Sequence, residues 1–152
     1  MKYLVLLHVL SAIIGVGPTF FGHVLYRKKQ TANELRVSVK LMAMLEFFPK
    51  IGGSIAVLSG LLLFFLNDYY GPFTQVWLLG SLILYILIQI VVIGLATPPA
   101  RKLAAWLSDP ANKNVQDSLP EEPKLLLHRV NGLFYLASGM GTLLFIFMIL
   151  KP

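Results

Sequence analysis

The chain contains no cysteine, and only 13% of its residues are charged. The first absence excludes disulfides, thiolate metal sites and cysteine nucleophiles. The second excludes an ordinary soluble surface, because about a quarter of the residues in soluble domains are charged. The sequence also has no glycine-rich phosphate loop, no Ser-His-Asp pattern and no metalloprotease motif. We therefore assign no catalytic residue and no metal ligand, and we expect a protein that is not an enzyme.

Apolar residues make up 57% of the chain, and they gather in four long runs. These runs cover approximately residues 3–26, 41–66, 76–97 and 125–150. Each is close to or longer than the roughly 20 residues that cross a hydrocarbon core as a helix. None shows the alternation of barrel strands. The sequence predicts an all-α integral membrane four-helix bundle in a lipid bilayer, with residues 1–152 forming a single transmembrane domain.

The distribution of charge predicts the orientation. The net charge is +6, but the basic residues lie between the apolar runs, which indicates membrane topology and not nucleic-acid binding. The first and third connections contain Arg27, Lys28, Lys29, Arg36, Lys40, Arg101, Lys102, Lys113 and Lys124. The second connection, residues 67–73, has no Lys or Arg. The positive-inside rule therefore predicts an N-out/C-out protein of an inner membrane.

The sequence supports two further expectations, an aromatic belt and a retained first span. An outer aromatic belt would comprise Tyr69, Tyr70, Phe73 and Trp77. The first run ends in consecutive basic residues without a small-residue cleavage site, so we expect a retained span and not a signal peptide.

The third connection is the long one. Two consecutive prolines follow Thr97, and we expect them to end the third helix there. Residues 100–107 are then predicted to form a short amphipathic interfacial helix, with Leu103 and Trp106 facing lipid.

Several polar residues lie near the cytoplasmic ends of the predicted spans. They are His23, Glu46, Lys50, His128, Arg129 and Asn131. Ionisable groups at membrane depth are costly, so each is a candidate functional residue. Because successive helices alternate in direction, these positions are predicted to share one layer near the cytoplasmic side.

Within this layer, Glu46 and Lys50 are spaced as an i,i+4 ion pair, and Pro49 between them is expected to kink the helix. One interpretation is a gate or a binding site. The other is a self-neutralised pair whose Lys50 extends toward the inner surface.

His8 occupies a different place, about two turns into the first run. The same stripe of the helix carries Ala12, Gly15, Thr19, Gly22 and Tyr26. Small residues on one face allow another helix to pack closely. The same surface could instead admit a porphyrin, with His8 as an axial haem ligand. His8 and His23 are about 22 Å apart along a helix, so they cannot bind one metal ion.

The segment from Leu7 to Phe21, with its Leu-His-Val-Leu start and its Gly-Val-Gly-Pro stretch, resembles a family of predicted bacterial integral membrane proteins of unknown function. More loosely, the layout is similar to CopD-type copper-resistance membrane domains and to HemJ-type proteins. The family resemblance implies a bacterial cell membrane. The HemJ resemblance implies that His8 is the position that could bind haem.

Three functional hypotheses remain open. The first is a small transport bundle or partner subunit with a polar layer near the cytoplasmic side, for which a homodimer is one arrangement. The second is a haem-binding or porphyrin-binding redox protein that uses His8. The third is a purely structural membrane bundle.

Overall fold

The computed structural model describes residues 1–66 and 71–151, and within them the chain is helical without β-strands. The elements are α1 (Lys2–Phe20), α2 (Gly22–Leu25), α3 (Ala32–Leu45), α4 (Phe47–Phe65), α5 (Val76–Gln89), the π-helix η2 (Ile90–Ala96), α6 (Thr97–Ser108), the short 3₁₀ helix η3 (Pro110–Asn112) and α7 (Glu121–Leu150). Tyr69 and Tyr70 of the predicted aromatic belt, and with them the first four residues of the predicted outer connection, lie outside the described residues.

These elements form four helical stretches that are long and apolar enough to cross a membrane. They are Lys2–Leu25, Ala32–Phe65, Val76–Ser108 and Glu121–Leu150. The all-α fold with four membrane-length helices is therefore confirmed. The lengths differ from the prediction because the helices continue beyond the apolar runs into polar sequence, as the next two stretches show.

The second stretch begins nine residues earlier than predicted, at Ala32 and not near residue 41. Thr31 and Glu34 form a capping box, in which each side chain accepts a hydrogen bond from the backbone N–H of the other residue. This arrangement satisfies two N–H groups that a helix start otherwise leaves unpaired. The cap starts a helix in a segment whose composition alone indicates a loop.

The third stretch does not end at Thr97, so the expectation that the two prolines stop the helix was wrong. Pro98 and Pro99 lie in the first turn of α6, which continues from η2. A proline is tolerated there because the first turn has no intrahelical acceptor for its missing N–H. The Thr97 hydroxyl also donates a hydrogen bond to the Val92 carbonyl at 2.8 Å. The segment predicted as a separate interfacial helix is thus the end of the third stretch.

Three of the four stretches are interrupted. The first breaks at Phe21, the second at Glu46, and the third through the π-helix η2, whereas α7 is continuous. Pro18 in α1 and Pro49 in α4 lie within three residues of the first two breaks. Each proline removes a hydrogen bond to the carbonyl four residues earlier, which weakens the helix at that point. The kink predicted at Pro49 stays a prediction, and the break at Glu46 lies three residues before it.

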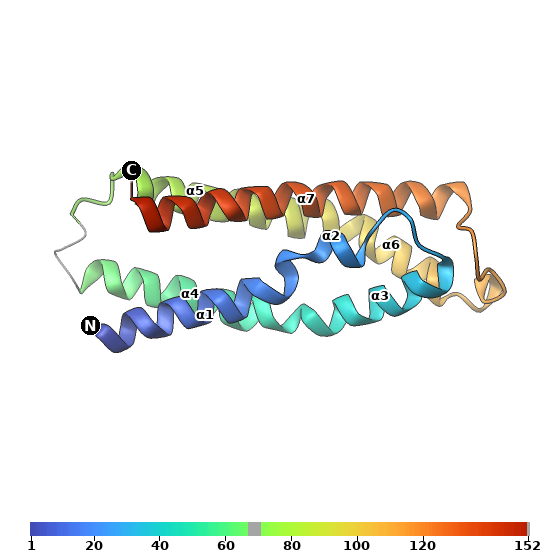
Figure 1. Ribbon diagram of the computed structural model, residues 1–152, viewed down its shortest axis with the longest axis horizontal. Coiled ribbons are helices and arrows are strands. Elements are labelled where there is room, and N and C mark those ends of the chain that lie inside the picture. The colour runs from blue at the N-terminus through green and yellow to red at the C-terminus, as the bar shows by residue number, and fades with distance from the viewer. Residues whose placement is uncertain (67–70, 152) are drawn as a thin grey trace.

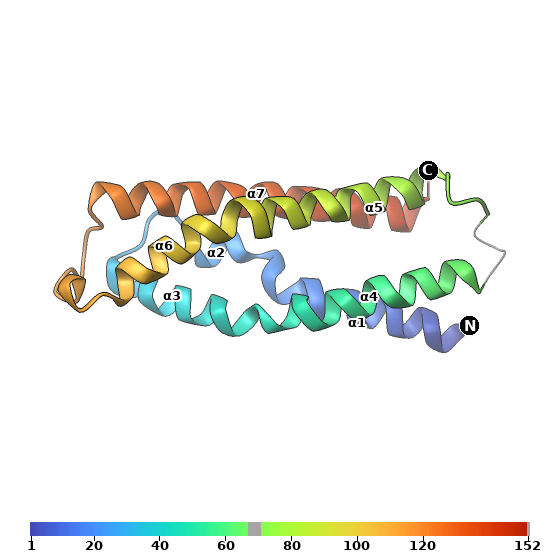
Figure 2. The ribbon, with the colours of Figure 1, turned by 180° about the vertical axis from the view of Figure 1, so that it is seen from behind.

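The helices form two pairs. α1 packs along α4 and α5 packs along α7, while α2 leaves the first pair and contacts α7. No Cα atom of α4 lies within 8 Å of a Cα atom of α5. Both termini lie at one end of the elongated molecule, and the first and third connections lie at the other (Figures 1 and 2). We call this second end, residues 22–46 and 97–130, the basic end, because it carries ten of the 13 Lys and Arg residues.

The main hydrophobic core lies at the basic end. Its buried members are Tyr26, Leu35, Met42, Ala96, Leu103, Leu107, Leu127, Val130 and Phe134. Leu103, predicted to face lipid, is fully buried in this core, and Trp106 packs against it. Elsewhere, the α1–α4 and α5–α7 contacts bury small residues such as Ser59 and Ser81, while large apolar side chains face outward.

The breaks coincide with the expected depth of a bilayer. A hydrocarbon core of about 30 Å corresponds to roughly 20 helical residues. That length, counted from Lys2, Phe65 and Val76, ends close to the breaks at Phe21, Glu46 and η2. The same count from the end of α7 reaches the segment around Val130. This count leaves the basic end with its buried core on the aqueous side of the membrane boundary.

Candidate functional site

The α1–α4 contact is built on glycine. A Cβ atom placed on Gly15 would lie 2.5 Å from the Gly52 carbonyl carbon and 2.6 Å from the Gly53 nitrogen. Both distances are too short for carbon, so the two backbones meet directly. Close backbone approach through small residues is the common mode of helix packing in membranes. The small-residue stripe on α1 is therefore occupied by α4 at Gly15.

His8 belongs to the same contact. Its Nδ1 lies 2.8 Å from the Ala56 carbonyl oxygen and 3.3 Å from Ser59 Oγ. A carbonyl only accepts, so Nδ1 carries the proton and donates to α4. The ring lies against Gly60, where a Cβ atom would be 2.9 Å from His8 Cε1. His8 thus forms an interhelical hydrogen bond on a surface that α4 covers.

His23 lies on α2, in a polar cluster with α7. Its ring stacks on Tyr135 with the centroids 4.2 Å apart, and its Nδ1 lies 3.3 Å from Ser138 Oγ. Asn131, which is 3% exposed, donates from Nδ2 to the His23 carbonyl at 2.9 Å. Ser138 donates to the Phe20 carbonyl at 2.6 Å. The break at Phe21 removes ordinary helical donors from this region, and side chains of α7 supply replacements.

Glu46 and Lys50 form the predicted ion pair, with Oε2 and Nζ 3.3 Å apart. Glu46 is 54% exposed and Lys50 is 73% exposed, so the pair is solvent-accessible at the junction of α3 and α4. The geometry matches a self-neutralised pair at the membrane boundary, where Lys50 can reach the headgroups. A gate in the interior of the bundle would require both side chains to point inward.

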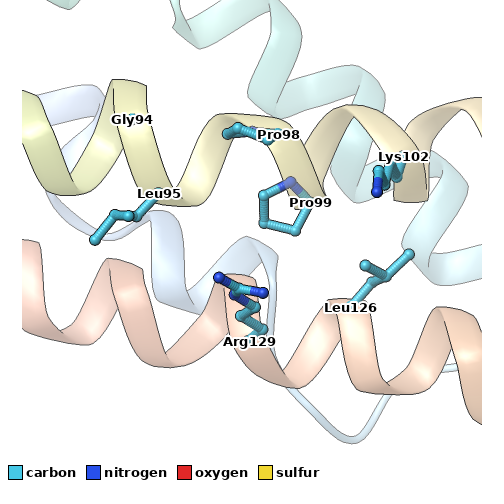
Figure 3. A pocket seen from close by; sticks show the side chains of 7 residues that line it. All are labelled: Gly94, Leu95, Pro98, Pro99, Lys102, Leu126 and Arg129. Atoms are coloured by element: carbon cyan, nitrogen blue, oxygen red, sulfur yellow. The ribbon is translucent and has the colours of Figure 1, made fainter.

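Arg129 lies beside a cavity between the third and fourth helical stretches. It lines a cavity of about 150 Å³ between η2–α6 and α7, together with Lys102 from α6. The other lining residues are Gly94, Leu95, Pro98, Pro99 and Leu126. Figure 3 shows the Arg129 guanidinium directed from α7 toward the proline turn. Within residues 1–66 and 71–151, neither cation has a carboxylate within ion-pair distance.

The predicted polar layer is therefore divided among separate places. His23 and Asn131 meet between α2 and α7. Glu46 forms an ion pair with Lys50, and Arg129 and Lys102 line the same cavity. His128 is half-buried on α7. In the part of the chain that the structure describes, no three His, Asp or Glu side chains gather as a metal site would require.

Three contributors were missed by sequence reasoning. Ser138 was not singled out, and Lys102 was counted only among the charges of the third connection, because the partner of each is more than 25 residues away in sequence. Arg36 had been counted only as a topological charge. It donates hydrogen bonds to the carbonyls of Leu107, Asn112 and Val115 at 3.2, 2.8 and 2.9 Å, which ties α3 to the end of α6. Long-range contacts of this kind leave no periodic signal in the sequence.

Comparison with known proteins shows that a family model matches nearly the whole chain. The model matches residues 2–152 and is described as "Predicted integral membrane protein (DUF2269)". No curated protein and no solved structure matches the chain significantly. The looser resemblance to CopD-type and HemJ-type proteins stays a prediction.

Proposed function

The chain belongs to the DUF2269 family of predicted integral membrane proteins, and from that premise we propose that it is a non-enzymatic subunit of a membrane assembly containing at least two copies of this chain. The protein is an integral membrane protein with four candidate spans. We further propose that it lies in a bacterial plasma membrane, that its four spans act as one transmembrane domain, and that its basic end faces the cytoplasm. The charge asymmetry supports this orientation.

The observation that carries the proposal is the separation of the two helix pairs. A self-contained four-helix bundle closes around a core along its whole length. Here the four stretches share a core only at the basic end, and α4 and α5 do not approach each other within 8 Å between Cα atoms. The accessible surface is 9610 Å², whereas a compact monomer of this mass exposes about 7,700 Å². The excess exceeds the roughly 800 Å² that each partner contributes to a standard interface. A second copy is the occupant that completes such a bundle by symmetry.

The polar side chains argue against transport by a single chain. A transport path requires polar groups of several helices to line one continuous space. Here His8 bonds within the α1–α4 pair, His23 bonds to α7, and Glu46 is paired with Lys50. The contact between α1 and α4 also argues against haem binding. The backbone of α4 already covers the α1 stripe at Gly15, where a porphyrin would have to lie.

The oligomeric state tests the proposal directly. Because the chain has no cysteine, a Lys113→Cys variant carries a single dye on an exposed residue of the third connection. In liposomes containing at most one assembly each, we expect two or more photobleaching steps per particle. Single steps throughout, after correction for labelling efficiency, would overturn the proposal.

A flux measurement separates the subunit from the transporter. Proteoliposomes of the purified chain are compared with those of the Glu46→Gln, Lys50→Met double variant. We expect no difference in ion or solute flux, because Glu46 and Lys50 neutralise each other and, within the described residues, line no cavity shared with His8 or His23. A flux present in the natural chain and lost in the double variant would establish the transport hypothesis instead.

A further inference from the structure

We propose that the cavity between η2–α6 and α7 binds the phosphodiester group of an anionic membrane lipid, with Arg129 and Lys102 as its ligands. This assignment goes beyond the subunit role and does not depend on the oligomeric state. It rests on the charge of the cavity, on its depth and on the shape of its walls.

The charge of the cavity is positive and uncompensated. Arg129 and Lys102 approach it from two different helices. The nearest acidic residues along α7 are Glu121 and Glu122, about two turns before Arg129, and Glu121 is engaged with Lys124 at 3.3 Å. A guanidinium donates two parallel hydrogen bonds to phosphate oxygens, and an ammonium adds a point charge. Both residues are exposed, and an anion in the cavity would contact both cations.

The depth of the cavity matches the headgroup layer. Leu95 is near the end of the roughly 20 residues that cross the hydrocarbon from Val76, and Lys102 is about two turns beyond it. Arg129 lies at the corresponding depth on α7. Basic pockets between transmembrane helices at this level are typical binding places for anionic lipid headgroups.

The walls of the cavity separate polar from apolar groups. Leu95, Leu126 and the two prolines form its apolar lining. A Cβ atom on Gly94 would meet nothing within 4 Å, so the surface beside the cavity is open toward lipid. The cavity has a volume of about 150 Å³, well above the space that a single water needs. This space suits a phosphodiester, while acyl chains would lie outside along η2.

The experiment uses the full chain in nanodiscs of phosphatidylcholine, titrated with phosphatidylglycerol, with bound lipid counted by native mass spectrometry. The pocket variant is Lys102→Gln with Arg129→Gln. The matched control, Arg101→Gln with Lys113→Gln, removes one Arg and one Lys from exposed positions of the same connection. Each of the two direct contacts to the phosphodiester should contribute about fivefold in affinity, so we expect roughly 30-fold weaker retention in the pocket variant. The control loses the same charge but no contact in the cavity, and its retention of phosphatidylglycerol should fall severalfold less.

Two further measurements keep the result interpretable. Equal melting temperatures of all three proteins in pure phosphatidylcholine establish that the substitutions leave the fold intact. Arg129→Lys alone, which keeps the charge but not the planar fork, should give an intermediate loss. The proposal is overturned if the pocket variant and the control lose lipid equally. It is also overturned if inorganic phosphate raises the melting temperature of the natural chain in phosphatidylcholine nanodiscs while added phosphatidylglycerol does not.

Discussion

At the residue scale, the α1–α4 contact depends on missing side chains. A Gly15→Ala substitution would place a methyl group 2.5 Å from the Gly52 carbonyl carbon, so the helices must separate. Overpacking of this kind costs about 1–3 kcal/mol. We expect a lower melting temperature in detergent or nanodiscs.

Gly17 supplies the matched control for this substitution. It lies on the same helix, and a Cβ atom there would meet nothing within 4 Å. Gly17→Ala should leave the melting temperature unchanged or raise it, because alanine favours a helix by up to about 1 kcal/mol. Similar losses in both variants would contradict the close backbone contact.

At the scale of the element, a single helical stretch combines two environments. Val37 on α3 and Leu58 on α4 are 59% and 63% exposed, and both belong to the stretch Ala32–Phe65. If the break at Glu46 marks the membrane boundary, Val37 faces water and Leu58 faces lipid. We expect a membrane-impermeant thiol reagent to label Val37→Cys and not Leu58→Cys.

The same two variants test which side of the membrane the basic end faces. With the basic end in the cytoplasm, Val37→Cys should react in inverted vesicles and resist the reagent in right-side-out vesicles. The natural chain, without cysteine, gives the background. Labelling of Val37→Cys from the outside would reverse the proposed topology. Labelling of Leu58→Cys would mean that Glu46 does not mark the membrane boundary.

At the scale of the whole molecule, hydrophobic burial is concentrated at the basic end. Leu103 is 0% exposed in that core, whereas Leu143 on α7 is 42% exposed. Leu103→Ala should lower the free energy of unfolding by about 2–5 kcal/mol, because it removes buried methyl groups and leaves a cavity. The measurement is denaturant unfolding in mixed micelles.

Leu143→Ala is the corresponding substitution on the lipid-facing surface. Lipid tails are as apolar as leucine, so removing this side chain costs little burial energy. We expect a loss below about 1 kcal/mol. An equal loss in the two variants would mean that the core at the basic end does not dominate the stability of the molecule.

The sequence by itself determined the membrane class and the number of spans, and its prolines pointed to weak places in the first two helices. Apolar length and proline chemistry are local properties, and a bilayer turns length directly into topology. The helix starting at Ala32 was also readable, since Thr31 and Glu34 carry the capping signal, but the polar composition of the segment obscured it. The continuation through Pro98 depended on its position in the first turn of α6.

Only the tertiary structure decided which polar residues meet. Arg129 and Lys102 lie 27 positions apart, and His23 and Ser138 lie 115 apart, so no periodicity connects them. The packing also decided that Glu46 and Lys50 stay exposed and that His8 bonds to Ala56. The physical reason is that hydropathy fixes the depth of a residue in the bilayer but not its angle around the helix. That angle, set by glycine contacts and a core beyond the membrane boundary, determines which polar groups can form a site.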